Sequence, residues 1–134
     1  MRIGEEISLR KQAVTTRQIA MYAGASGDFN PIHYDHLIAQ QAGLGGVIAH
    51  GMLSMGFSAQ MVGESMSEYG WIREIRVRFL SPVRPGDVVV LGGKVVGIEQ
   101  AGQQDEVIRL ELEASVDGRT VLRGAALVAP HPTG

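Results

Sequence analysis

The side chains best suited to transfer protons are concentrated in one short segment, Ser26-Gly27-Asp28-Phe29-Asn30-Pro31-Ile32-His33. Pro31 fixes its own φ and directs Asn30 toward an extended conformation, so we expect this segment to be a stiff loop. A stiff loop suits general acid–base catalysis, because a displacement of about 1 Å can greatly slow a reaction. If the Asp28 carboxylate and the His33 imidazole face one pocket, they can hold one water molecule between them.

A second segment, Ile48-Ala49-His50-Gly51-Met52-Leu53, lies where a long apolar helix is expected to begin. Backbone N–H groups at the start of a helix lack partners, and the helix dipole favours negative charge there. Such groups suit a carbonyl that becomes an enolate, and Gly51 permits its close approach. Each segment also has a simpler explanation. Asp28 can cap a turn beside an interior His33, and Gly51 can be a packing point under a sheet.

Helix signals occupy the first half of the chain, where both segments lie. Thr15 begins a capping-box pattern, and the helix that follows is expected to stop near Gly24. Asp35 can cap a second, short helix that ends at Gly43. A third helix is expected over about residues 51–66. Its side chains are apolar nearly all round, which predicts that this helix is buried on most sides.

Strand signals fill the second half. Apolar and polar residues alternate over 74–79 and 108–116, whereas 88–96 is apolar on both faces, which is typical of a central strand. Asp117-Gly118 is a strong two-residue hairpin signal, and residues 7–9 suggest a short opening strand. The pattern predicts an α+β fold in which a curved antiparallel sheet wraps around the third helix. Because exposed edge strands are usually paired or covered, we expect a dimer.

The composition is that of a single globular domain over residues 1–134, with 45% hydrophobic and 19% charged residues. The net charge is −2 without a cluster of Lys or Arg, which argues against a nucleic-acid or anionic-membrane partner. The absence of cysteine excludes disulfides, thiolate catalysis and Cys-ligated metals. We find neither an apolar signal core after the first residues nor a run that approaches a membrane span. A soluble cytoplasmic protein is therefore expected.

Metal ligation is a weaker interpretation of the same polar residues. His33, His36 and His50, together with Asp28 and Asp35, supply ligand types that metals use. The chain lacks a helical H-x-x-x-H or comparable spacing, so we expect no metal and no cofactor.

The two segments together, in this order and at this separation, resemble the MaoC-like family of R-specific enoyl-CoA hydratases and hydroxyacyl thioester dehydratases, which have the hot-dog fold. A third match is Val77-Arg78-Phe79-Leu80-Ser81-Pro82-Val83-Arg84-Pro85-Gly86-Asp87, typical of the strand and turn after the central helix. The resemblance covers nearly the whole chain. It is particularly close to small single-domain members, including dehydratase subunits of mycobacterial-type long-chain fatty acid synthesis.

The resemblance implies a hydro-lyase that interconverts a trans-2-enoyl thioester and an (R)-3-hydroxyacyl thioester, carried on coenzyme A or acyl carrier protein. It implies that Asp28 and His33 activate the water that attacks C3, and that the Gly51 N–H stabilises the enolate oxygen. Asn30 would orient the catalytic loop, and His50 would brace the turn by hydrogen bonding.

One position departs from the family pattern. Some members carry a serine on the central helix, where this chain has Ala59 with Ser58 beside it, so Ser58 is not counted as catalytic.

Two further groups of residues are explained without a role in catalysis or substrate binding. Tyr34, Tyr69 and Trp71 are expected in the core or lining a pocket. Four arginines could contact the phosphates of coenzyme A or an acyl carrier protein, but their positions are already explained if they lie on a solvent-exposed strand face: Arg73, Arg76, Arg78 and Arg84.

Other functions on the same fold remain open. A hot-dog thioesterase would use the same helix start as an oxyanion hole, but it usually needs a carboxylate on or opposite the central helix, which offers none before Glu64. A non-catalytic acyl-thioester-binding subunit is the second alternative, although retention of both Asp28 and His33 speaks against it. We expect a homodimer or a larger homo-oligomer, and pairing with a related subunit remains open.

Overall fold

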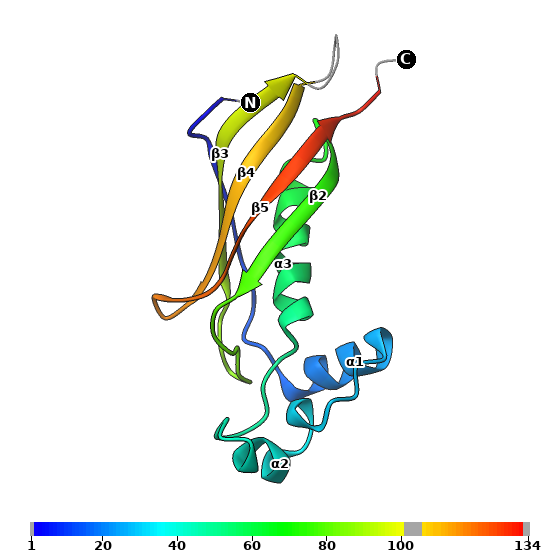
Figure 1. Cartoon of the computed structure of the whole chain (residues 1–134), viewed down its shortest axis with the longest axis vertical. Helices are drawn as coiled ribbons and strands as arrows, with labels where there is room; N and C mark the ends of the chain where they lie inside the picture. The colour runs from blue at the N-terminus through cyan, green and yellow to red at the C-terminus, as the bar shows by residue number, and fades with distance from the viewer. Residues whose placement is uncertain (1, 101–105, 133–134) are drawn as a thin grey trace.

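The computed structural model describes residues 2–100 and 106–132. Its elements, in chain order, are β1 (Glu6–Arg10), α1 (Thr16–Ser26), the 3₁₀ turn η1 (Pro31–His33), α2 (His36–Gln41), α3 (Gly51–Ser65), β2 (Gly70–Phe79), β3 (Val90–Gln100), β4 (Glu106–Val116) and β5 (Arg119–Pro130). The strands form one antiparallel sheet in the order β1-β3-β4-β5-β2. The sheet curves around α3, while α1 and α2 lie beyond one end of it (Figure 1). The predicted α+β architecture is therefore confirmed.

The core lies between α3 and the concave face of the sheet. Along β4, Leu110, Leu112 and Ala114 are buried, whereas the alternating Glu111 and Glu113 are exposed. Full burial of a leucine side chain contributes about 1.5–3 kcal/mol relative to its exposure. From α3, the core receives the side chains Leu53, Phe57, Met61 and Val62.

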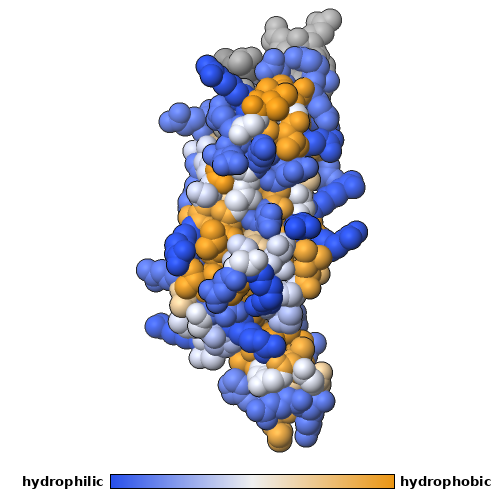
Figure 2. Space-filling view, turned by 90° about the vertical axis from the view of Figure 1, so that its left-hand side faces the viewer, coloured by the Kyte–Doolittle hydropathy of each residue, from blue (hydrophilic) through white to orange (hydrophobic). Residues whose placement is uncertain are grey.

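The outer face of the sheet has a different character. Figure 2 shows the left-hand side of the molecule as drawn in Figure 1, and hydrophilic side chains dominate it between separate hydrophobic patches. Arg73, Arg76 and Arg78 lie on β2 and are exposed, as predicted, whereas Arg84 is exposed but lies between β2 and β3 and not on a strand. Among the described residues, no helix has the length and apolar character needed to cross a membrane.

Two helix starts and the hairpin between β4 and β5 follow the local signals closely. Asp117 and Gly118 both have positive φ, of 49° and 78°, which is the conformation of the predicted two-residue hairpin. Thr15 caps α1 by accepting a hydrogen bond from the Gln18 N–H at 3.0 Å. Asp35 likewise caps α2.

The predicted end of α1 is wrong. The helix passes through Gly24 and ends at Ser26, and Gly27 supplies the left-handed residue with φ 76°. A glycine inside a helix costs only about 1 kcal/mol, so Gly24 does not stop the helix by itself. The left-handed glycine after the last turn marks the end.

Two predictions of burial are also wrong in the single chain. α3 is buried on one side only: Met52 is 54% exposed, and Gly56 and Gly63 are exposed on the same helix. The sheet covers one face of a helix, so apolar composition alone overstates its burial. Tyr34 and Trp71 are 56% and 53% exposed and are not core residues, whereas Tyr69 packs against the core.

Candidate active site

The loop between α1 and α2 is held by a chain of short-range hydrogen bonds. The Asp28 N–H donates to Ser26 Oγ at 3.1 Å, and the Asn30 N–H donates to Asp28 Oδ1 at 3.2 Å. Asn30 Oδ1 in turn accepts from the Ile32 N–H at 3.2 Å and so caps η1, which begins at Pro31. These contacts give the predicted stiff loop a physical basis.

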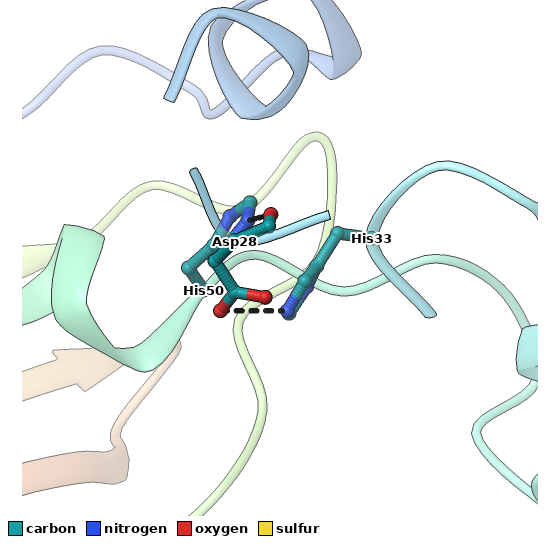
Figure 3. A group of neighbouring side chains, drawn as sticks. All are labelled: Asp28, His33 and His50. Atoms are coloured by element: carbon teal, nitrogen blue, oxygen red, sulfur yellow. Dashed lines mark hydrogen bonds and ion pairs between the residues drawn. The ribbon is translucent and has the colours of Figure 1, made fainter. Parts of the chain in front are cut away.

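The loop brings the Asp28 carboxylate and the His33 imidazole together. Asp28 Oδ2 and His33 Nε2 are 3.9 Å apart, with Asp28 54% exposed and His33 8% exposed (Figure 3). His33 Nδ1 lies 2.7 Å from the Ile48 carbonyl oxygen. A carbonyl only accepts, so Nδ1 carries the proton of the neutral ring, and Nε2 is left as the acceptor that faces Asp28.

His50 contacts both Asp28 and His33. Its ring is 2% exposed and stacks on the His33 ring, with centroids 3.7 Å apart and planes inclined by 23°. His50 Nε2 lies 3.0 Å from the Asp28 carbonyl oxygen. The predicted hydrogen-bonding residue therefore contacts both members of the pair rather than only its own turn.

Gly51, the residue after His50, begins α3. The preceding His50 occupies the N-cap position and its side chain forms no cap hydrogen bond, while the Leu53 N–H donates to the His50 carbonyl at 3.0 Å. A Cβ on Gly51 would lie 3.1 Å from the ring of Phe79, at the end of β2. The site thus combines a carboxylate–imidazole pair with the start of α3, where the N-cap side chain forms no cap hydrogen bond.

The same cluster contains the atoms best placed to bind a metal. One ligand atom from each of Asp28, His33 and His50 lies within 4.8 Å of the others. His33 Nδ1 and His50 Nε2 each lie at hydrogen-bond distance from a backbone carbonyl oxygen, which leaves only His33 Nε2 and His50 Nδ1 with a free lone pair. His36 and Asp35 are engaged elsewhere: His36 Nδ1 accepts a backbone N–H at 3.2 Å, and Asp35 caps α2. That the site works without a metal stays a prediction.

The central helix adds no acidic or nucleophilic group to this cluster. Ser58 is buried, and its hydroxyl donates to the Ser54 carbonyl at 3.3 Å within the helix. Ala59 is half-buried, and Glu64 lies in the last turn of α3, where it is exposed and accepts from the Gln60 amide at 3.0 Å. The Ser58 hydroxyl is thus engaged by its own helix.

Three contacts of the site were missed by the sequence reasoning. They are the Ile48 carbonyl that fixes His33, the stack of His50 on His33, and the Tyr22 ring, which meets His50 edge-on at 4.8 Å. A backbone carbonyl carries no sequence signal, and the Tyr22 contact depends on how α1 packs against the start of α3.

Comparison with known proteins agrees with this architecture. Residues 1–116 match the family model described as the MaoC like domain. An (R)-specific enoyl-CoA hydratase of Rhodospirillum rubrum is 32% identical over 126 residues, which cover 93% of this chain and 85% of that protein. Several other curated relatives are far longer, and this chain spans 11% or less of their length.

Solved structures share the fold. The (R)-hydratase from A. caviae involved in PHA biosynthesis superposes with a TM-score of 0.86 at 23% identity, over 98% of both chains. A chain of the ChsH1-ChsH2 complex from Mycobacterium tuberculosis also gives a TM-score of 0.86, at 17% identity, over 98% of this chain and 99% of that one. The fold is therefore the predicted hot-dog fold, and the chain belongs to the MaoC like domain family.

Proposed function

We propose that the protein adds water to the C2–C3 double bond of a trans-2-enoyl thioester, or removes it from an (R)-3-hydroxyacyl thioester. The observation that carries this proposal is the approach of Asp28 Oδ2 to within 3.9 Å of His33 Nε2, beside the uncapped start of α3. Family membership and the similarity to an (R)-specific enoyl-CoA hydratase support the same reaction class.

The separation of the pair suits one bridging water. At 3.9 Å the two atoms are too far apart for a good direct hydrogen bond, yet a water about 2.8 Å from each fits between them. Asp28 Oδ2 and His33 Nε2 are both acceptors, so this water donates both of its protons to the pair. Its oxygen lone pairs are then free to attack carbon.

In the hydration direction, the water oxygen forms a bond to C3 while the pair takes one proton from it. The electrons of the double bond move toward the thioester carbonyl, which becomes an enolate. The Gly51 N–H stabilises the enolate oxygen, because the helix dipole favours negative charge at the start of α3. The pair then returns the proton to C2. Asp28, His33 and Gly51 are the proposed catalytic residues, and Asn30 orients the loop that carries Asp28 and His33.

The acyl carrier is either coenzyme A or acyl carrier protein, and the mechanism requires neither a metal nor a cofactor. We further propose a homodimer or larger homo-oligomer in the cytoplasm. The exposed side of α3 and the two sheet edges, β1 and β2, are surfaces that a second chain could cover. Pairing with a related subunit is the alternative, since one structural neighbour comes from a two-protein complex.

The test follows absorbance at the enoyl-thioester band while purified protein acts on crotonyl-CoA and on a longer trans-2-enoyl-CoA, with free thiol assayed in parallel. Loss of the band without free thiol is the expected result. Release of free thiol would instead identify a thioesterase. If the protein binds acyl-CoA but consumes neither enoyl-CoA, a non-catalytic binding subunit would be favoured.

A further inference from the structure

We infer that His50 is a positioning residue that holds both members of the catalytic pair, through a hydrogen bond to Asp28 and a ring stack on His33. The inference rests on the proposed function, because it assigns His50 a role in the same reaction. His50 is only 2% exposed and so does not meet the substrate itself.

The hydrogen bond to Asp28 is the first contact. Asp28 is otherwise held from within its own loop, by the Ser26 hydroxyl and the Asn30 N–H. The bond from His50 Nε2 to the Asp28 carbonyl, at 3.0 Å, ties this exposed loop to the residue that precedes α3. It therefore limits how far the Asp28 backbone can move from the helix start that receives the enolate.

The ring stack is the second contact. His50 covers one face of His33 at 3.7 Å, while Tyr22 meets His50 edge-on at 4.8 Å. The three rings form a column that joins α1, the start of α3 and η1. Together with the Ile48 carbonyl at 2.7 Å from His33 Nδ1, this column leaves the His33 ring little freedom to turn away from Asp28.

One tautomer of His50 satisfies these contacts. The Asp28 carbonyl only accepts, so His50 Nε2 carries the proton. Nδ1 is then an acceptor, and it is the one buried side-chain nitrogen or oxygen without a hydrogen-bond partner in residues 2–100 and 106–132. The opposite tautomer would leave a buried N–H donor unpaired and would set two acceptors, Nε2 and a carbonyl oxygen, against each other. A residue that only filled space would not need a donor aimed at the Asp28 carbonyl.

The role can be tested by separating the two contacts. In His50→Gln the side-chain amide nitrogen reaches about the position of Nε2, so the hydrogen bond to Asp28 is kept while the stack is lost. In His50→Phe the stack is kept and the donor is lost. We expect kcat to fall roughly 10-fold in His50→Gln and about 100-fold in His50→Phe, with KM nearly unchanged in both.

Stability provides the contrast with a structural role. Phenylalanine fills the buried space better than glutamine, so a packing role predicts that His50→Phe keeps more stability and more activity. Positioning predicts the reverse order for kcat. Wild-type kcat in His50→Phe, or a kcat that follows the melting temperature across both variants, would overturn the inference.

Imidazole ¹⁵N spectra test the inference without any activity measurement. We expect a protonated Nε2 and an unprotonated Nδ1 for His50, assigned by comparison with His50→Gln. A protonated Nδ1 on His50 would overturn the inference even in an active enzyme. If the wild type hydrated no enoyl thioester while His50 kept the expected tautomer, the proposed function would fail but the hydrogen bond to Asp28 would stand.

Discussion

Replacing Gly51 by alanine tests the start of α3 as the enolate-binding group. The added Cβ would lie 3.1 Å from the Phe79 ring, whereas carbon atoms in ordinary contact are about 3.5–4.0 Å apart. The ring must therefore retreat by roughly 0.4 Å. Phe79 is an exposed side chain at the end of β2, so it can move without disturbing the core.

The stability of Gly51→Ala is expected to change little. Alanine is favoured over glycine in a helix by up to about 1 kcal/mol, which offsets the crowding against Phe79. We expect the free energy of unfolding to change by less than about 1 kcal/mol. The rate should change more, because the methyl group and the displaced ring lie beside the proposed enolate donor. A misplacement of this kind lowers kcat by about 10-fold to 100-fold.

The assay measures initial rates on crotonyl-CoA together with urea unfolding, for Gly51→Ala and for Gly51→Ala combined with Phe79→Ala. The double variant removes the crowded ring and should recover part of kcat if ring displacement causes part of the loss. Wild-type kcat and KM in Gly51→Ala would refute the assignment of the enolate donor. An unchanged kcat with a raised KM would move Gly51 from enolate stabilisation to substrate binding.

Three further predictions follow from the structure. Asn30→Ala removes the cap of η1 and should lower the free energy of unfolding by about 1 kcal/mol and kcat by roughly 10-fold. Asn30→Asp keeps the accepting oxygen and should have nearly wild-type stability and kcat, so equal rates in the two variants would count against the capping role. Gly124→Ala places a Cβ 2.0 Å from the Arg76 carbonyl oxygen and should lower the free energy of unfolding by about 3 kcal/mol. The control Gly92→Ala, whose Cβ has no atom within 4 Å, should change it by less than about 1 kcal/mol, and equal urea midpoints for the two variants would contradict the β2–β5 pairing. Light scattering should report a dimer or larger assembly, and an active monomer would show that the exposed side of α3 needs no second chain.

Much of the fold could be predicted from the sequence because its signals are local. The Thr15 and Asp35 caps and the Asp117-Gly118 hairpin each depend on a few neighbouring residues. The errors arose where the outcome depends on distant residues. The exposure of Met52 depends on how far the sheet extends around α3, which periodicity does not encode.

In the candidate site, too, the local contacts could be predicted and the contacts between distant residues could not. Asp28 and His33 lie together because Pro31 and the capping oxygen of Asn30 shape one short loop, of which the sequence indicated the stiffness imposed by Pro31 but not the cap. The Ile48 carbonyl and the His50 ring reach this loop from the start of α3. Their exact partners depend on tertiary packing, so the sequence could suggest that His50 forms a hydrogen bond but not that it stacks on His33.

The central claim is that Asp28 and His33 activate water together, and the most direct measurement compares Asp28→Asn with Asp35→Asn on crotonyl-CoA. Both variants replace a carboxylate by an amide, and each amide oxygen can keep the local cap that the carboxylate makes. An amide at position 28 can donate to His33 Nε2 instead of accepting a proton from water. We predict that Asp28→Asn loses about 10²–10⁴ in kcat at unchanged stability, while Asp35→Asn stays near wild type. A rate for Asp28→Asn within a few-fold of wild type would contradict the mechanism.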